Sequence, residues 1–170
     1  MAHWSGGCVV FALGVAVVVL AGCPRDRRGG GGPVRLEPGH PVTRTLSGGK
    51  AHTYLVALKA GQYVRVAAEQ KGIDVVLRLL APDGRELIAV DSPNGAWGPE
   101  RASEVAATAG YYRIEVRSDN ATDKPGQYEM RIEELRPATE RDRTRVAAER
   151  VYAEGEGLRR AKAWEKAMES

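Results

Sequence analysis

Hydrophobic and polar residues alternate through the middle of the 170-residue chain. Tyr112, Ile114 and Val116 fall on one side of an extended strand, and the charged residues between them fall on the other. Residues 127–133 repeat this period of two, which is typical of antiparallel strands with one buried and one solvated face. We expect about eight strands, among them residues 54–58, 63–68, 75–80, 87–90, 105–107, 112–116 and 128–132.

Turn signals divide residues 34–136 at regular intervals. Seven residue pairs ending in glycine, such as Asp83-Gly84 and Asn94-Gly95, follow one another with their glycines 11 to 16 residues apart. Short strands separated at about this spacing are typical of an antiparallel sandwich or barrel. The longest stretch without a strand pattern is residues 92–101, which contain Trp97. We expect this stretch to be an irregular loop.

A different pattern occupies the amino terminus. Residues 9–21 form a run of 13 residues without a polar side chain, which fits the core of a secretory signal better than the roughly 20 residues of a membrane-spanning helix. The run ends in Leu20-Ala21-Gly22-Cys23, which resembles the lipobox of bacterial lipoproteins. The resemblance implies cleavage after residues 1–22 and acylation of the Cys23 thiol. The alternative is an uncleaved anchor over residues 6–23, and both place the following residues outside the cytoplasm.

Residues 23–33 are expected to form a tether between the membrane and a folded domain. Four consecutive glycines predict a flexible coil, and three arginines beside Cys23 would lie close to anionic lipid headgroups or simply in solvent. Cys8 would leave with the signal and Cys23 would be acylated, so no cysteine pair remains for an internal disulfide. The domain is therefore expected to depend on its hydrophobic core alone.

Composition and charge exclude several functions. The chain is 43% hydrophobic and 28% charged, a balance typical of a globular protein. The net charge is +3, but residues 34–136 hold 14 basic and 14 acidic residues. A nucleic-acid-binding groove needs clustered basic residues on the folded part, so we expect no nucleic-acid partner. The three histidines and two cysteines have no metal-site or hydrolase spacing, so we expect no enzyme activity.

Several motifs in residues 34–136 together resemble the bacterial pre-peptidase C-terminal domain. They are Asp74-Val75-Val76-Leu77-Arg78-Leu79, Pro82-Asp83-Gly84, Asp91-Ser92, Gly110-Tyr111-Tyr112-Arg113-Ile114-Glu115-Val116 and Gly126-Gln127-Tyr128, preceded by Leu46-Ser47-Gly48-Gly49 and Tyr54. The resemblance implies a mainly β, jelly-roll-like sandwich. It also implies accessory work beside secreted peptidases, in some relatives with binding of calcium, polysaccharide or matrix protein.

The resemblance raises the question of a calcium site. Asp74, Asp83, Asp91 and Asn94 offer hard oxygen ligands of the kind that calcium prefers. The alternative is that Asp83 and Asn94 are ordinary turn residues before glycine. Trp97 is a candidate for stacking on a sugar or on a partner's side chain, and its alternative role is to cover the end of the sandwich.

Residues 137–170 change to a helical pattern. Thr139 with Asp142 three residues later resembles a capping box. An apolar stripe at helical spacing follows, and Gly155 and Gly157 interrupt it, which predicts a bend or two short helices. The stripe consists of Ala147, Val151, Leu158, Ala161, Trp164 and Met168. The segment resembles the lead into tetratricopeptide-type repeats of exported caspase-like proteins; the alternative is a helix that packs on the sandwich or on a partner.

Together these patterns predict a signal peptide in residues 1–22, a tether in 23–33, a β-sandwich in 34–136 and a helical tail in 137–170. The predicted function is that of a lipid-anchored, non-catalytic binding or scaffolding domain in the bacterial cell envelope, facing the periplasm or the exterior. Its partner would be a protein or a polysaccharide, in addition to the membrane. The alternatives are a surface module of a larger peptidase and a calcium-dependent carbohydrate- or matrix-binding module.

Overall fold

The computed structural model describes residues 32–168. The predicted signal peptide, the lipobox, Cys23 and nearly all of the tether lie outside the described residues. Within this part of the chain, no helix is both long and apolar enough to cross a membrane.

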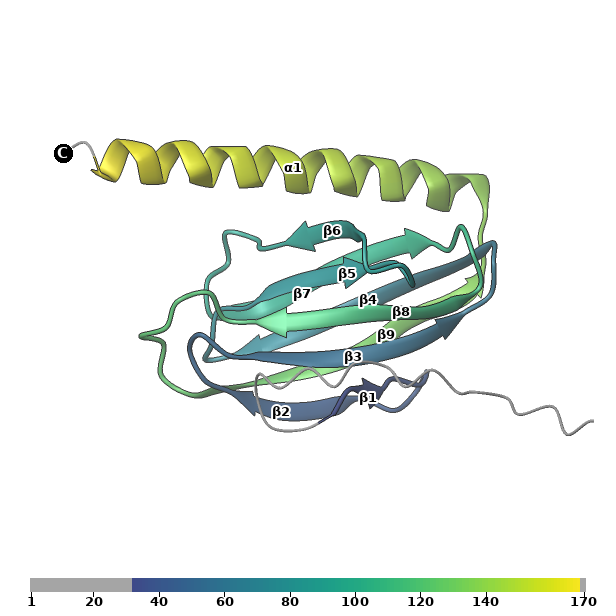
Figure 1. The fold of residues 1–170 in the computed structure, drawn as a ribbon, viewed down its shortest axis with the longest axis horizontal. Coiled ribbons are helices and arrows are strands. Elements are labelled where there is room, and N and C mark those ends of the chain that lie inside the picture. The colour runs from purple at the N-terminus through teal and green to yellow at the C-terminus, as the bar shows by residue number, and fades with distance from the viewer. Residues whose placement is uncertain (1–31, 169–170) are drawn as a thin grey trace, which may run out of the picture.

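Two packed sheets form the body of the protein (Figure 1). One sheet has the order β1-β3-β8-β5-β6, and the other has the order β2-β9-β4-β7. Every strand pair is antiparallel except β1 with β3. The strands are β1 (Val34–Arg35), β2 (Val42–Leu46), β3 (Ala51–Leu58), β4 (Gln62–Lys71), β5 (Val76–Leu80), β6 (Glu86–Val90), β7 (Trp97–Val105), β8 (Gly110–Arg117) and β9 (Gly126–Pro137).

The alternating residues of the central strands supply the core, as predicted. Tyr112, Ile114 and Val116 on β8 are almost completely buried, whereas Arg113 between them is exposed. On β9, Tyr128 and Met130 are buried in the same way. The two inner faces thus meet in one hydrophobic core, and the prediction of a mainly β sandwich is confirmed.

The strand expected at residues 105–107 is wrong in position, and the loop expected at residues 92–101 ends at residue 96. Strand β7 covers Trp97–Val105 and pairs with β4 from Tyr63 opposite Val105 to Lys71 opposite Trp97. Gly98 and Pro99 weaken the local strand pattern, which is why the sequence predicted a loop. Because β7 is the last strand of its sheet, it tolerates a proline that lacks a backbone N–H.

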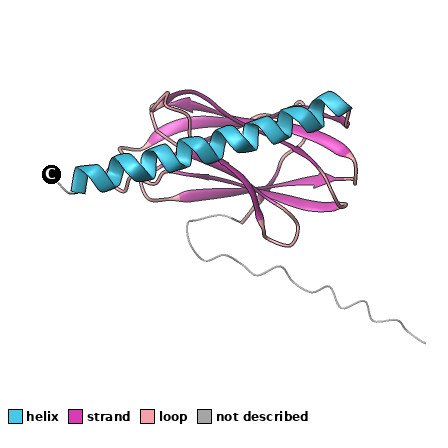
Figure 2. Cartoon of the chain, turned by 90° about the horizontal axis from the view of Figure 1, so that it is seen from above, coloured by secondary structure: helices cyan, strands magenta, loops and turns pink. Residues whose placement is uncertain are grey.

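A single helix, α1 (Glu140–Met168), follows the last strand and has 29 residues. It runs along the side of the sandwich where β6 and β7 form the ends of their sheets (Figures 1 and 2). The helix therefore covers two strand edges that would otherwise be free to pair with another chain. Of the two alternatives for the tail, the structure shows a helix that packs on the sandwich.

The start of α1 follows the predicted capping box. The backbone N–H of Asp142 donates to Thr139 Oγ1 at 3.4 Å, and that of Thr139 donates to Asp142 Oδ2 at 2.8 Å. Arg136 on β9 donates to both oxygens of the same carboxylate, at 2.6 and 2.9 Å. These hydrogen bonds hold the pKa of Asp142 well below its usual range, Arg136 contributing most. The cap thus fastens the helix to the end of β9.

The predicted bend at Gly155 and Gly157 is wrong, since α1 is continuous through both. The predicted packing side of the helix is also wrong. Val151 and Leu158 are 71% and 67% exposed, whereas Val146 is 5% exposed. Polar contacts decide this orientation, because Arg150 pairs with Glu104 and Arg160 pairs with Asp91, both on the sandwich. The predicted stripe also contains Trp164, which lies outside the described side chains.

Replacing Gly155 by alanine is expected to raise the free energy of unfolding by about 0.5–1 kcal/mol, because glycine is a poor helix former. A Cβ at this position meets nothing within 4 Å, so no clash offsets the gain. Thermal or urea denaturation of the full chain measures the change. The same substitution at Gly61, where φ is +78°, is the control and should destabilise the protein. A loss of stability in Gly155→Ala would contradict the continuous helix.

Candidate functional site

The four predicted calcium ligands do not come together. Asp74 precedes β5 and Asp91 follows β6, so both lie at one end of this antiparallel pair. Asp83 lies at the other end, in the turn between the two strands. Its Oδ1 accepts a hydrogen bond from the Arg85 backbone N–H at 2.9 Å, as expected for an ordinary turn residue.

Of the two aspartates that share an end, Asp91 is already engaged. Arg160 of α1 pairs with the Asp91 carboxylate and donates to its backbone oxygen. The pKa of Asp74 is raised, mainly by burial and then by the neighbouring Asp91 and Asp123. Residues 32–168 contain no group of three or more acidic, histidine or cysteine side chains arranged to hold a metal ion. Calcium binding stays a prediction, which a calcium titration of the melting temperature would check.

Asn94 is exposed but is bonded to a buried polar network that the sequence did not reveal. Gln70 Nε2 donates to Asn94 Oδ1 and to Glu100 Oε1, both at 3.2 Å. The backbone N–H of Val75 donates to Gln70 Oε1, and Ser92 donates to Glu100 Oε2 through its backbone N–H and its hydroxyl. Burial raises the pKa of Glu100. The network ties together the chain before β5 and the chain after β6, so its role is structural. One sequence pattern could have revealed Glu100: it lies two residues before Ala102 and therefore on the same side of a strand. That pattern is lost when residues 92–101 are taken as a loop.

Trp97 is the first residue of β7 and is 67% exposed. It therefore does not cover the end of the sandwich, and that alternative is wrong. Its exposure is what stacking on a ligand requires. Stacking by Trp97 stays a prediction.

A second buried polar group lies between β3 and β9. His52 Nδ1 and Tyr128 OH are 2.7 Å apart, and the hydroxyls of Tyr54 and Tyr128 are 2.6 Å apart. Arg44, opposite Tyr128 on β2, adds positive charge. Burial and then Arg44 lower the pKa of His52, and burial foremost raises the pKa values of both tyrosines. All three side chains are thus kept neutral, which suits an interior hydrogen-bond chain.

The lowered pKa of His52 predicts a loss of stability in mild acid. The unfolded chain takes up a proton near pH 6.5, and the folded protein takes it up only at lower pH. The contribution of His52 to stability is therefore complete above pH 6.5 and decreases as the pH falls below it. We expect His52→Asn, whose amide can still bond to Tyr128, to remove this part of the pH dependence of the melting temperature. If the melting temperature of His52→Asn changed between pH 7 and 5 as much as that of the unsubstituted protein, the prediction would be contradicted.

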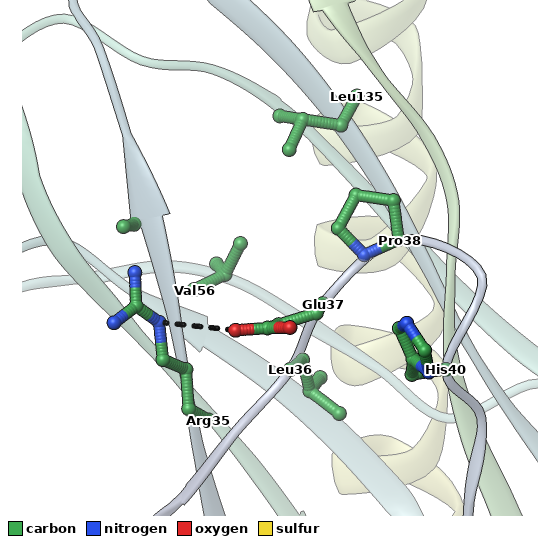
Figure 3. Close-up of a pocket in the computed structure, with 8 residues that line it drawn as sticks. Arg35, Leu36, Glu37, Pro38, His40, Val56 and Leu135 are labelled. Atoms are coloured by element: carbon green, nitrogen blue, oxygen red, sulfur yellow. Dashed lines mark ion pairs between the residues drawn. The ribbon is translucent and has the colours of Figure 1, made fainter.

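Two hollows in the part of the chain that the structure describes are candidate ligand sites. The first lies beside the amino-terminal strands and has a volume of about 310 Å³ (Figure 3). Its charged walls are Arg35 and Glu37, whose Nε and Oε1 atoms form an ion pair at 3.9 Å. Its apolar walls include Leu36, Val56 and Leu135. Since the two charges neutralise each other, this hollow does not call for a ligand with a net charge.

The second hollow is a groove between α1 and the strands β6 and β7, with a volume of about 430 Å³. Its floor and walls are largely apolar. The groove is lined by Ile88, Val90, Ser92, Pro99, Arg101, Ala148, Glu149, Tyr152 and Ala153.

Several large hydrophobic side chains of α1 are exposed among its charged residues. Six large hydrophobic side chains of the described residues are mainly exposed, and four of them lie on this helix. We call these four the outer surface of α1. They are Val151, Tyr152, Leu158 and Met168, with exposures of 59% to 74%. Tyr152 also lines the groove, so the outer surface and the groove are continuous.

The fold and this surface define a β-sandwich domain that carries an exposed helix along one side. A comparison with protein-family models finds no match, and a comparison with curated proteins finds none either. Among solved structures, the chain is similar to the pre-peptidase C-terminal domain of a collagenase from Bacillus anthracis. The TM-score is 0.48 and the identity 15%, over 66% of this chain and 99% of that one.

The chain is also similar to PliG, a periplasmic inhibitor of g-type lysozyme, from two bacteria. For the Aeromonas hydrophila protein the TM-score is 0.45 and the identity 16%, over 59% of this chain and 96% of that one. For the Salmonella Typhimurium protein the values are 0.44 and 20%, over 61% and 100%.

Proposed function

We propose that this protein is a lipid-anchored, extracytoplasmic, non-catalytic module that binds a protein partner through the outer surface of α1. The observation that carries the proposal is the exposure of Val151, Leu158 and Met168 on a helix that is already packed on its other side. A row of large apolar side chains in solvent is costly for a monomer and typical of an interaction surface. An apolar helix face of this kind fits a groove or helix of a protein partner.

The internal use of the polar residues supports a non-catalytic role. The buried carboxylate of Glu100 is bonded to Ser92 and Gln70, and His52 is bonded to the Tyr128 hydroxyl. Glu100 and His52 hold strands or loops together, and neither lines either of the two hollows. Catalysis instead needs a nucleophile, base or acid within reach of a bound substrate.

The anchoring part of the proposal rests on the sequence. Cys23 follows Leu20-Ala21-Gly22 directly after the apolar run, and acylation at this position would hold the domain at the membrane with α1 free to meet a partner. Two or more acyl chains give stable attachment, since each buried methylene contributes about 0.8 kcal/mol.

Two measurements test the proposal in the bacterial host. Cys23→Ser is expected to abolish labelling by radioactive palmitate and to leave the larger precursor. A photoreactive residue at position 152 is expected to form a discrete adduct with a partner protein, and Val151→Ser with Leu158→Ser should remove that adduct without changing the melting temperature. Arg141→Ser, an exposed change elsewhere on α1, is the control. Persistent labelling in Cys23→Ser would refute the anchor. An adduct that still forms when Val151 and Leu158 are both replaced by serine would refute the binding role of the outer surface.

A further inference from the structure

The hollow beside the amino-terminal strands contains an ion pair that is open to solvent. The side chains of Arg35 and Glu37 are 59% and 61% exposed, so a ligand in the hollow can reach both of them. Their Nε and Oε1 atoms are 3.9 Å apart (Figure 3), which is too long for a hydrogen bond. Within residues 32–168 neither side chain forms a hydrogen bond. The donors of Arg35 and the acceptors of Glu37 are therefore free to meet a ligand.

The two charges of this pair form a dipole. A ligand that carries one positive and one negative group can align with the dipole in the opposite direction, so that each charge meets its complement. Arg35 would then donate hydrogen bonds to the anionic group, and Glu37 would accept one from the cationic group. A simple anion or cation would gain one attraction and meet one repulsion. The pair is thus complementary to a zwitterion.

The surroundings of the pair limit the size of this zwitterion. The hollow has a volume of about 310 Å³, at the lower end of the range for ligand pockets. Its apolar lining includes Leu36 and Val56, which are 3% and 1% exposed. The guanidinium carbon of Arg35 lies 5.7 Å from the centre of the Tyr111 ring, a stacking contact that helps to hold the cation in place. A small zwitterion with a short carbon linker fits these dimensions.

The position of the hollow favours a lipid headgroup as the zwitterion. Strand β1 is the first strand after the predicted tether, and Arg35 lies 12 positions after Cys23. With Cys23 acylated, the chain between them can span at most about 40 Å. Headgroups would then be present at an effective concentration on the order of millimolar or higher, so an open and weak site would still be occupied. Tyr111 is 53% exposed, and tyrosine is favoured at the level of the headgroups.

We propose that this hollow binds the phosphoethanolamine headgroup of a membrane lipid, with Arg35 donating to the phosphate and Glu37 accepting from the primary ammonium group. This inference rests on the lipid anchor of the proposed function. Strands β1 and β6 are the two ends of the five-stranded sheet, and α1 runs beside β6 (Figure 1). Binding at β1 would therefore turn α1 away from the membrane, where a partner can reach it.

Titrations with water-soluble headgroup probes test the site. The full chain is held in micelles of dodecyl maltoside, a detergent without charge, and the readout is the amide chemical shifts of Leu36, Ala57 and Leu135. The probes are glycerophosphoethanolamine, glycerophosphocholine, whose quaternary ammonium cannot donate a hydrogen bond, and glycerophosphoglycerol, which has no ammonium group. We expect saturable shifts with glycerophosphoethanolamine and binding of the other two that is weaker by about threefold or more.

A substitution of Glu37 tests the role of the pair. Glu37→Gln removes the acceptor of the ammonium group and leaves Arg35 in place. It should weaken the binding of glycerophosphoethanolamine by about threefold or more. It should also reverse the preference in favour of glycerophosphoglycerol, because no carboxylate then repels the anion. The control, Glu154→Gln, removes an exposed acid of α1 that does not line the hollow and should change nothing. Melting temperatures verify that both variants are folded.

The outcomes separate this site from the proposed function. Equal binding of glycerophosphoethanolamine and glycerophosphocholine, or an unchanged preference in a folded Glu37→Gln protein, would overturn the headgroup site. Free alanine is a further probe, and tighter binding of alanine would assign the hollow to amino acids and overturn the lipid. The probes report on the hollow whether or not Cys23 is acylated. A chain that fails to take up palmitate but binds glycerophosphoethanolamine would therefore refute the proposed anchor alone.

Discussion

Replacing Ile114 by alanine is expected to lower the free energy of unfolding by about 2–5 kcal/mol. Ile114 is fully buried on β8, which lies between β3 and β5 in the five-stranded sheet. Its neighbours across the two ladders, Tyr54 and Leu79, are also fully buried. The shorter side chain would leave a cavity that these packed strands cannot fill by moving. Urea denaturation followed by circular dichroism measures the loss.

The adjacent residue supplies the control. Arg113 precedes Ile114 on the same strand but points to solvent, so Arg113→Ala should change the stability by no more than about 0.5 kcal/mol. A loss below about 0.5 kcal/mol for Ile114→Ala itself would mean that the two sides of β8 have been assigned the wrong way round.

Removing α1 by ending the chain at residue 138 is expected to cost about 3–5 kcal/mol and to lower the melting temperature by about 10–20 °C. Burial of Val146, which is 5% exposed, contributes about 1.5–3 kcal/mol, and the helix cap at Thr139 contributes about 1 kcal/mol. The remainder comes from Ala153, which packs against the core, and from the contacts of Arg150 and Arg160. Thermal unfolding of the two chains compares them directly.

Two valines on the same helix provide a matched control for this result. Val146→Ala removes a buried side chain and should cost about 1–3 kcal/mol. Val151→Ala removes one that is 71% exposed and should leave the stability within about 0.5 kcal/mol. An unchanged midpoint after removal of α1, or equal effects of the two valine changes, would show that the helix does not stabilise the sandwich.

The β-sandwich was predictable because its signal is local. In β8 and β9 the side chains alternate between core and solvent, and an alternation of period two is visible in any short window of sequence. The capping box at Thr139 and Asp142 was predictable for the same reason. Strand β7 was not, because Gly98 and Pro99 resemble a loop, and only pairing with β4 makes the segment extended.

The candidate ligand site was not predictable from motifs. The predicted calcium ligands are spread over both ends of the β5–β6 pair, and Asp91 is taken by Arg160, 69 residues later in the chain. Arg35 and Glu37 carry no motif in the sequence. They become notable only because the fold places both exposed side chains beside one hollow.

By itself, then, the sequence determined where most of the strands lie, although not β7, and that residues 140–168 favour a helix. Each of these depends on neighbouring residues alone. Only the tertiary structure decided which side of α1 meets the sandwich. The most apolar side of the helix is the natural choice from sequence, yet Val151 and Leu158 are exposed. The helix is oriented by its ion pairs with Glu104 and Asp91 and by the Arg136–Asp142 contact. Only the folding of the two sheets brings these partners beside the helix.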